Sequence, residues 1–433
     1  MSKRDSFGSK IGAILVAAGS AIGLGSIWRF PYMTGENGGG AFLIVYLASM
    51  LVVGIPVMLA EFAIGTHTRK SPVKAYNQLS PRWKWLGYNS VIVSLLISGF
   101  YYIVAGWSLE YFISSIDGSL YSSAVDFNAH FSQFISSWHE PLYTFVFIAL
   151  THIVVVMGVQ NGLERISKIV MPVLLIMLIV LVIHSASMSG AAEGYSFLFS
   201  PDFDKAFSIK TIVSAIGQAF FSLSIGLGCM IAYSSYFQEG TNLTKTSFSV
   251  SLMTFFVALL SGMVIFPAVF SVEGLEPTAG PTLLFETLPF IFAEMPASAL
   301  WSAIFFLLVV LAALTSTISF HEVLTQYLQE NHNIERKKAA LLTSLATVAL
   351  TVICLKWGVF FDTFDTITAD WLMPLGGLFT SIFAGWVLDR KAFNDEISNH
   401  GTLRARLFPL LLFTLKWIAP ILLSVVFVWN LVF

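Results

Sequence analysis

The chain has 433 residues, of which 56% are hydrophobic and only 11% are charged, and its mean hydropathy is +0.79. Soluble domains carry about 25% charged residues, so this composition excludes an ordinary soluble domain and indicates a membrane protein. The net charge of −2 gives no support to nucleic-acid binding. The two cysteines, Cys229 and Cys354, both lie in apolar stretches, so no disulfide framework is expected.

Eleven apolar segments recur along the chain, and each is long enough for a membrane-spanning helix. A lipid-exposed backbone must satisfy its own hydrogen bonds, so we expect a single all-α polytopic membrane domain over residues 1–433. The expected spans are residues 11–33, 41–64, 88–113, 142–160, 166–188, 210–237, 247–272, 298–328, 338–356, 367–388 and 405–431.

Lysine and arginine are concentrated in alternate connections between these spans. Residues 65–87 and 389–406 carry several bases, whereas residues 108–141 and 273–297 carry none. By the positive-inside rule we expect a cytoplasmic N-terminus. An odd number of spans then places Phe433 on the outside.

The sequence Ile-Gly-Leu-Gly occurs twice, at residues 22–25 and 225–228. A glycine costs about 1 kcal/mol relative to alanine in a helix interior. We therefore expect each pair of glycines to interrupt its helix, one in the first span and one in the sixth. Interrupted helices at matching places in two halves indicate the binding site of a secondary transporter. Because each half has five spans, the second half must be inverted in the membrane relative to the first. The first repeat is expected over residues 11–188 and the second over residues 210–388, and the span at residues 405–431 belongs to neither. Close packing of glycines between helices is the alternative explanation.

Arg29 follows the first break while still inside a span. An arginine within the membrane is costly, so we expect it to line water or to pair with a carboxylate. The alternative is that its side chain extends to the membrane surface.

Four motifs then point to one family. They are Gly19–Pro31, Asn37–Phe42, Phe220–Gly228 and Leu314–Thr317. Together they resemble the neurotransmitter:sodium symporter (NSS/SNF) family, in its eleven-span prokaryotic branch. The resemblance covers essentially the whole chain and implies a LeuT-type 5+5 inverted repeat with discontinuous helices 1 and 6, plus an eleventh span. It also implies a multi-pass protein of the bacterial inner membrane that is not an enzyme.

The resemblance implies two sodium (Na+) sites. The second site maps onto the carbonyl oxygens of Gly19, Ile22 and Ala312 and the hydroxyl groups of Thr315 and Ser316. Such oxygen atoms suit a hard cation. Without the resemblance, packing between helices is the better explanation of the two hydroxyl groups.

The first sodium site maps onto Ala21, Ser26, Ser222 and Thr254, together with the substrate carboxylate. Family members usually have Asn in place of Ser26 and Asn or Asp in place of Thr254. Both departures shorten the reach or remove an amide or a charge. We therefore hypothesise a single sodium ion per substrate, with the missing charge carried by protons or not at all.

The position that decides chloride (Cl−) dependence in the family maps onto Tyr46, Gln218, Ser222 and Ala258. Chloride-dependent members have a serine in place of Ala258, and some chloride-independent members have a carboxylate there or at the position of Thr254. This chain has neither, so the resemblance leaves chloride dependence open.

The resemblance also implies a substrate pocket with the carboxylate of the substrate at the N–H groups of Leu24 and Gly25 and the hydroxyl of Tyr101. Monoamine transporters of the family have an Asp in place of Gly23, so glycine favours an amino acid here. The amine is expected at backbone groups of the two breaks. The implied substrate-binding residues are Ala21, Gly23, Leu24, Gly25, Ile97, Tyr101, Phe221, Ser222, Ser224, Leu227, Ser316 and Phe320.

These pocket side chains include no ionisable group other than the tyrosine hydroxyl, and burying an unpaired charge is costly. We therefore expect a neutral, hydrophobic or aromatic amino acid, without being able to name it.

Two gates are implied by the same resemblance. Arg29 is expected to pair with Asp365 over the outer side of the pocket, and Arg4 with Glu330 near the cytoplasm. Ion pairs that form in one state alone bias a two-state equilibrium, which suits alternating access.

His321 and Glu322 are further ionisable residues in an apolar span, and Glu322 is either a proton-coupling group or a buried structural partner. Glu61 ends the second span and is a candidate to brace the first helix. The chain has no P-loop or zinc-ligand spacing.

The predicted function is sodium-coupled symport of an amino acid into the cell, with the substrate and membrane lipid as partners and an unknown oligomeric state. A proton-coupled or exchanging amino-acid carrier on the same fold is the first alternative. A sensor that binds an amino acid without transporting it is the second.

Overall fold

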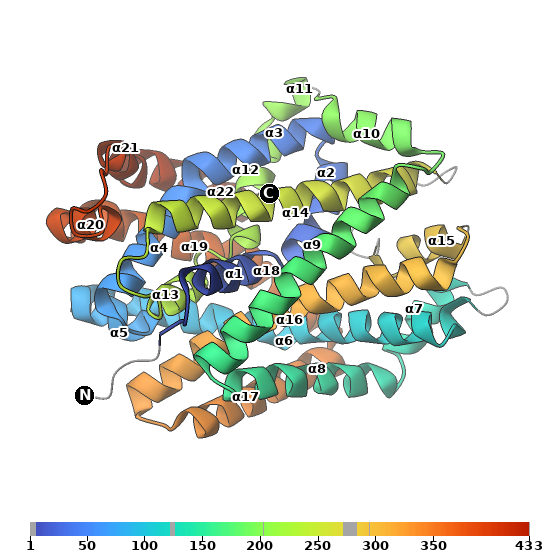
Figure 1. The fold of residues 1–433 in the computed structure, drawn as a ribbon, viewed down its shortest axis with the longest axis horizontal. Coiled ribbons are helices and arrows are strands. Elements are labelled where there is room, and N and C mark those ends of the chain that lie inside the picture. The colour runs from blue at the N-terminus through green and yellow to red at the C-terminus, as the bar shows by residue number, and fades with distance from the viewer. Residues whose placement is uncertain (1–5, 122–125, 202, 272–283, 294, 433) are drawn as a thin grey trace.

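The structure is a computed structural model that describes residues 6–121, 126–201, 203–271, 284–293 and 295–432. Within these ranges the regular elements are all helical. The long helices run side by side along the longest axis of the molecule (Figure 1). Such a bundle satisfies backbone hydrogen bonds inside each helix, as a chain this apolar requires in lipid.

Nine helical stretches in the described ranges are long and apolar enough to cross a membrane. Each coincides with a span expected from the sequence, although Gly358–Val387 begins well before the expected residue 367. The nine stretches are Gly40–Thr68, Pro81–Ile116, His139–Val156, Val159–Ser185, Leu243–Phe270, Ser298–His332, Arg336–Lys356, Gly358–Val387 and Phe408–Val432.

Four of these stretches contain short π-helical segments (η), and one begins with a 3₁₀ turn, η3. Their parts are α3 (Gly40–Ser49), η2 (Met50–Gly54), α4 (Ile55–Thr68), η3 (Pro81–Trp83), α6 (Lys84–Ile116), α8 (His139–Val156), η5 (Val159–Glu164), α9 (Arg165–Ser185), α14 (Leu243–Phe270), α16 (Ser298–His332), α17 (Arg336–Lys356), α18 (Gly358–Thr366), η7 (Ile367–Leu372), α19 (Met373–Ile382), η8 (Phe383–Val387), α21 (Phe408–Phe413), η9 (Thr414–Ile418) and α22 (Ala419–Val432).

The first span is interrupted, as expected. It consists of α1 (Lys10–Ala21), the π-helical η1 (Gly25–Arg29) and α2 (Phe30–Glu36), and the two halves meet at an angle of 53°. The sixth span is also interrupted, between α12 (Ile209–Ser222) and α13 (Cys229–Ser234). This confirms the prediction of discontinuous first and sixth helices.

The backbone of the sixth span explains its break. Gly226 and Gly228 have φ angles of +83° and +78°, and Ser224 between α12 and these glycines has φ of +52°. Left-handed backbone of this kind suits glycine and cannot continue an α-helix.

Shorter helices lie at the two ends of the bundle (Figure 1). One end carries α5 and α20, and the opposite end carries α7 and α15. The short elements are α5 (Pro72–Leu79), η4 (Ser119–Tyr121), α7 (Phe127–Ile135), α10 (Ala191–Phe199), α11 (Phe203–Ala206), α15 (Thr287–Ala293) and α20 (Arg390–Ile397).

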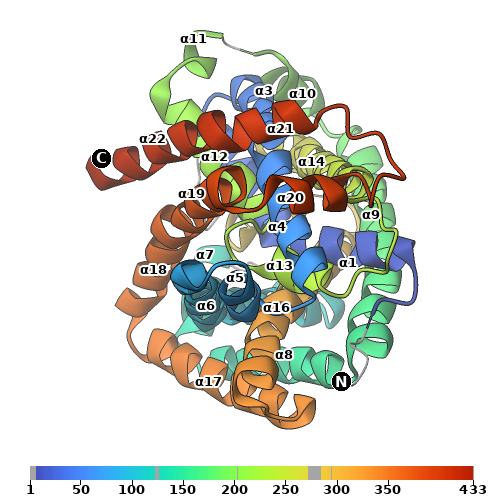
Figure 2. The same cartoon turned by 90° about the vertical axis from the view of Figure 1, so that its left-hand side faces the viewer.

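The two interrupted spans lie in the interior. Seen end-on, α4, α13 and α16 lie toward the middle, with α8, α17, α18 and α22 around them (Figure 2). The residues of the breaks are correspondingly buried, with Ile22, Leu24, Leu223 and Ile225 fully inaccessible to solvent. Backbone groups freed by the breaks therefore face protein rather than lipid.

Candidate functional site

The two breaks face each other and are joined by side-chain hydrogen bonds. Ser224 Oγ donates to the carbonyl oxygen of Ser20 over 2.8 Å, and Gln218 Nε2 donates to that of Gly25 over 2.7 Å. Both accepting carbonyls belong to the region where the first span is interrupted. Ser224 thus satisfies an acceptor at the break, whereas the carbonyl oxygen of Gly25 also accepts the N–H of Phe30 within the π-helix.

Two glycines of the first break are required by close contacts. A Cβ atom on Gly23 would collide with Ser316 Oγ and would lie 2.8 Å from Tyr101 Oη. A Cβ atom on Gly25 would lie 2.6 Å from a ring carbon of Phe221. The glycines therefore allow helices from three parts of the chain to meet at one point.

A narrow cavity lies between the breaks. Its volume is about 10 Å³, about enough for one water molecule. Ten of the twelve lining residues are among those expected from the family resemblance. They are Ala21, Gly23, Gly25, Ile97, Tyr101, Phe221, Ser224, Leu227, Ser316 and Phe320.

Tyr101 crosses the cavity from α6. Its hydroxyl oxygen accepts a hydrogen bond from the N–H of Leu24 over 3.0 Å. The ring meets that of Phe320 edge-on, with centroids 5.1 Å apart. Leu24 thus contributes its backbone N–H to the site rather than its side chain. The side chains that line the cavity carry no charge.

Two lining residues, Ser20 and Met373, were not expected from the sequence. Met373 reaches the cavity because α19 approaches the second break closely: a Cβ atom on Gly376 would lie 2.6 Å from the carbonyl oxygen of Gly226. The pair Gly376–Gly377 is the signal that sequence reasoning missed, since adjacent glycines permit such an approach.

Three residues expected at the second sodium site, Gly19, Ala312 and Thr315, lie close together where α1 meets α16. Gly19 of α1 faces Thr315 of α16, since a Cβ atom on Gly19 would lie 3.3 Å from Thr315 Cβ. Thr315 Oγ1 donates to the carbonyl oxygen of Ala312 over 2.9 Å, which leaves its lone pairs available to a cation. Ser316 Oγ donates to the carbonyl oxygen of Ser20 over 3.5 Å. This buried, uncharged set of oxygens fits sodium.

The hydroxyl groups expected at the first sodium site all take part in hydrogen bonds within the protein. Ser26 Oγ donates to the carbonyl oxygen of Ala21 over 3.4 Å, and Thr254 Oγ1 donates to that of Val250 over 2.9 Å. Ser222 Oγ accepts a hydrogen bond from Gln218 Nε2 over 2.9 Å. These hydroxyl groups lie in the same buried region, and they carry no formal charge.

The same region fits chloride poorly. An anion needs several free donors, but Gln218 directs its amide hydrogens to Gly25 and Ser222. Ala258 has no donor in its side chain. The Tyr46 hydroxyl is buried without a hydrogen-bond partner among the described residues.

Arg29 covers the cavity on one side, but its ion pair differs from the expected one. Its guanidinium carbon lies 4.6 Å from the ring centroid of Phe221, and Nη2 lies 3.9 Å from Oδ1 of Asp370. The expected partner Asp365 forms no ion pair with Arg29 in the described residues. Asp365 of α18 is near enough to interact electrostatically with Arg29, but Asp370 of the π-helical η7 makes the closer contact.

At the opposite side, Arg4 lies outside the described residues, so its expected pairing with Glu330 is not described. Glu330 Oε2 accepts a hydrogen bond from the N–H of Ser71 over 2.8 Å. The start of α1 is held by another carboxylate, Glu164, which accepts from the N–H of Gly8 over 2.5 Å and from Ser9 Oγ over 2.9 Å. Lys168 Nζ lies 2.6 Å from the same carboxylate.

Glu61 contacts the sixth span rather than the first. Its Oε1 accepts the N–H of Gly226 over 2.8 Å, because the left-handed turn at Gly226 directs this N–H away from helical partners. Glu322 forms a two-pronged ion pair with Arg336, with distances of 3.0 and 2.6 Å, and accepts from Tyr236 Oη over 2.7 Å. His321 Nε2 lies 3.2 Å from the carbonyl oxygen of Ala340.

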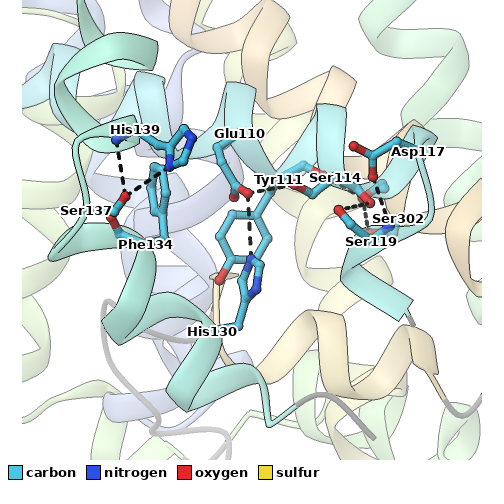
Figure 3. Close-up of polar contacts among 11 residues, drawn as sticks. Glu110, Tyr111, Ser114, Asp117, Ser119, His130, Phe134, Ser137, His139 and Ser302 are labelled. Carbon is cyan, nitrogen blue, oxygen red and sulfur yellow. Dashed lines mark hydrogen bonds and ion pairs between the residues drawn. The ribbon is translucent and has the colours of Figure 1, made fainter. Parts of the chain in front are cut away.

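At the end of α6 beyond Arg29, the short helix α7 packs over the bundle. His130 of α7 lies 3.6 Å from the carboxylate of Glu110, which also accepts a hydrogen bond from Ser114 over 2.6 Å (Figure 3). Phe131 packs edge-on against Trp107, with ring centroids 5.1 Å apart. These contacts hold α7 in place as a cover of this end.

The chain matches known proteins over nearly its whole length. The model of the sodium:neurotransmitter symporter family matches residues 4–137 and 130–433. An uncharacterised sodium-dependent transporter, YhdH of Bacillus subtilis, is 36% identical, with 97% of this chain and 96% of that protein aligned. A sodium-dependent transporter of Haemophilus influenzae is 34% identical, with 99% and 98% aligned.

A solved structure extends the likeness to the fold. The crystal structure of MhsT in complex with L-phenylalanine superposes with a TM-score of 0.91 and 37% sequence identity, covering 98% of this chain and 99% of MhsT. The fold is therefore the LeuT-type arrangement expected from the sequence, and the protein is a multi-pass membrane transporter that couples to sodium, not an enzyme. The chain belongs to the sodium:neurotransmitter symporter family.

Proposed function

We propose that this sodium-coupled transporter imports a neutral, hydrophobic or aromatic amino acid by alternating access. The observation that carries the proposal is the Leu24–Tyr101 pair in a buried cavity that no charged side chain lines. One wall offers an N–H and a hydroxyl, and the rest is apolar or aromatic. A zwitterion with an uncharged side chain matches this distribution of polar groups.

The carboxylate of the substrate takes the place of the Leu24–Tyr101 hydrogen bond. The Leu24 N–H and the Tyr101 O–H each donate to one carboxylate once the bond between them is broken. The substrate amine then meets carbonyl oxygens of the breaks, among them that of Ser20, which already accepts from Ser224. The phenylalanine bound to MhsT supports an amino acid as substrate.

The side chain of the substrate enters among Phe221, Phe320 and Met373. With a volume of about 10 Å³ the cavity holds no amino acid as it stands, so these side chains must separate on binding. Methionine and phenylalanine side chains can rotate to make room. Their apolar surfaces then stabilise an apolar or aromatic substrate side chain by burying it.

One sodium ion is bound per substrate, at Gly19, Ile22, Ala312, Thr315 and Ser316. Buried hydroxyl and carbonyl oxygens of two facing helices support this site. The first site is left without an ion because its ligands lack the amide or the carboxylate of other members. Chloride has no role, since Ala258 offers no donor and Gln218 directs its amide hydrogens to Gly25 and Ser222.

The N-terminus lies in the cytoplasm of a bacterial cell and Phe433 lies outside, as the distribution of lysine and arginine indicates. Residues 11–188 and 210–388 form two inverted five-span repeats, and residues 405–431 add the eleventh span. Arg29 and Phe221 then close the outer side of the cavity, and Glu164 holds α1 on the inner side. Sodium and substrate act by favouring one state of this two-sided equilibrium.

The test is uptake of radiolabelled amino acids into proteoliposomes, with sodium, proton and chloride gradients imposed one at a time. Accumulation driven by sodium alone, with one ion per substrate, supports the proposal. Two cooperative sodium ions per substrate reject the single-ion assignment. Proton-driven uptake, counterflow without sodium, or binding without flux identify the carrier or the sensor instead.

A further inference from the structure

A second hollow, which shares no residue with the cavity, is an open groove on the apolar outer surface of the bundle. It has a volume of about 920 Å³ and runs along the last span. Helix α22 and the preceding η9 form one side, and α19 with η8 and the start of α12 form the other. Helices α12, α19 and α22 lie next to one another in the end-on view (Figure 2). Its walls are open and apolar: Val428 is 55% exposed and Ile209 is 58% exposed.

A lysine lies in this apolar groove. Lys416 is eight residues beyond the start of α21, which places its Cα about 12 Å along the span. Helical side chains tilt toward the N-terminus of their helix, so the ammonium group reaches back toward the Arg404–Arg406 end of the span. A cation at this depth needs a counter-charge or access to the headgroup layer.

Aromatic residues hold Lys416 at the edge of the groove. Its Nζ lies 4.6 Å from the ring centroid of Trp386, whose Nε1 donates to the backbone carbonyl of Lys416 over 3.2 Å. The Trp386 ring meets that of Trp417 edge-on, with centroids 5.0 Å apart. Tryptophan pairs of this kind are typical of the headgroup level of a membrane.

In the part of the chain that the structure describes, the charge of this lysine is not paired with a carboxylate. The groove thus combines one positive charge at its cytoplasmic end with an apolar channel that extends to Val432. An anion attached to a long hydrocarbon chain complements both features.

From this geometry we infer that the groove is a binding site for one anionic phospholipid of the cytoplasmic leaflet. Lys416 binds the phosphate, Trp386 and Trp417 flank the glycerol region, and an acyl chain lies along α22 toward Val428. The orientation rests on the cytoplasmic N-terminus proposed above; the lipid site itself does not depend on the substrate. Failure of uptake assays would therefore leave this inference standing, and the reverse also holds.

The test compares two lipids and two matched lysines. Purified protein is titrated with phosphatidylglycerol or phosphatidylcholine, and bound lipid is counted by native mass spectrometry. Lys416→Gln removes the charge in the groove. Lys356→Gln is the control, because Lys356 Nζ lies 4.7 Å from the ring centroid of Trp357 but belongs to a different helix and lines no part of the groove.

We expect wild-type protein to prefer phosphatidylglycerol over phosphatidylcholine about fivefold, the effect of one lysine near a membrane surface. Lys416→Gln removes this preference and Lys356→Gln keeps it. A second variant, Val428→Trp, fills the groove and weakens the binding of both lipids while the protein keeps its unfolding temperature.

Three results overturn the inference. The first is equal binding of the two lipids to the wild type. The second is an equal loss of preference in the two lysine variants. The third is a dimer in detergent that Val428→Trp converts to monomers, since the groove is then an interface between copies of this chain.

Discussion

Leu24 and Tyr101 are 77 residues apart in sequence, yet the N–H of Leu24 donates to the Tyr101 hydroxyl over 3.0 Å. The bond joins an interrupted helix to a continuous one at the centre of the bundle. The Leu24 N–H and the Tyr101 hydroxyl are the two groups proposed to bind the substrate carboxylate, so substrate binding must break the hydrogen bond between them.

Tyr101→Phe should weaken substrate binding about tenfold or more, because a hydrogen bond to a charged group contributes about 1.5–3 kcal/mol. Equilibrium binding of the transported amino acid measures this loss. Tyr102→Phe is the control, since the neighbouring hydroxyl donates to the carbonyl of Thr317 over 3.5 Å, away from the cavity. Unchanged binding by Tyr101→Phe would show that the carboxylate lies elsewhere.

Thr315→Ala should raise the sodium concentration for half-maximal uptake about tenfold, because one of few oxygen ligands to the cation is lost. The substrate affinity at saturating sodium should stay near that of the wild type. Thr317→Ala, whose hydroxyl lies 2.9 Å from that of Thr151 between helices, should leave the sodium dependence unchanged. Equal shifts in both variants would indicate a packing defect rather than a lost ligand.

Asp370→Asn should lower the uptake rate about fivefold while substrate affinity changes little, because its ion pair with Arg29 is partly exposed and forms on closure. Asp365→Asn should lower uptake less. Asp362→Asn on the same helix serves as the control. A full loss with Asp365→Asn and none with Asp370→Asn would restore the partner expected from the sequence.

Glu164→Gln should loosen the start of α1, since the buried carboxylate accepts hydrogen bonds from Gly8 and Ser9. Cys229 is fully buried in α13, which packs against α1, and serves as a native reporter. In a Cys354→Ser background we expect Cys229 to react with a maleimide about tenfold faster. The exposed Glu335→Gln should show no such change, and an unaltered rate in Glu164→Gln would contradict the anchoring role.

Glu322→Gln should destabilise the protein by about 3–5 kcal/mol, because it leaves the Arg336 guanidinium without its buried partner. The midpoint of thermal unfolding measures this effect. The double variant Glu322→Gln, Arg336→Gln should recover part of the loss. Full stability of Glu322→Gln together with lost proton-driven uptake would instead favour the proton-coupling role considered from the sequence.

The membrane architecture could be predicted from the sequence because hydrophobic length and glycine breaks are local properties. The start of the Gly358 span was missed because Asp362 and Asp365 lower its hydropathy, although the helix continues through them. The helix α7 was also missed, since it lies in a connection without basic residues or a long apolar run.

Contacts between distant helices were harder to predict. Met373 reaches the cavity because α19 closely approaches Gly226, an approach that Gly376 and Gly377 permit but do not specify. Glu61 was expected to brace the first helix, but the direction of the Gly226 N–H decided its partner. These contacts depend on how distant helices pack in three dimensions, which cannot be read from the pattern of residues in one sequence.

The narrowness of the cavity bears on how tightly a substrate can be held. The Leu24–Tyr101, Ser20–Ser224 and Gly25–Gln218 hydrogen bonds draw the two breaks against each other and against α6. An entering amino acid must replace the first of these bonds and separate the packed side chains, so only the surplus over these costs appears as affinity. Such moderate net binding suits a transporter, because a substrate that is bound too tightly would not be released on the other side of the membrane.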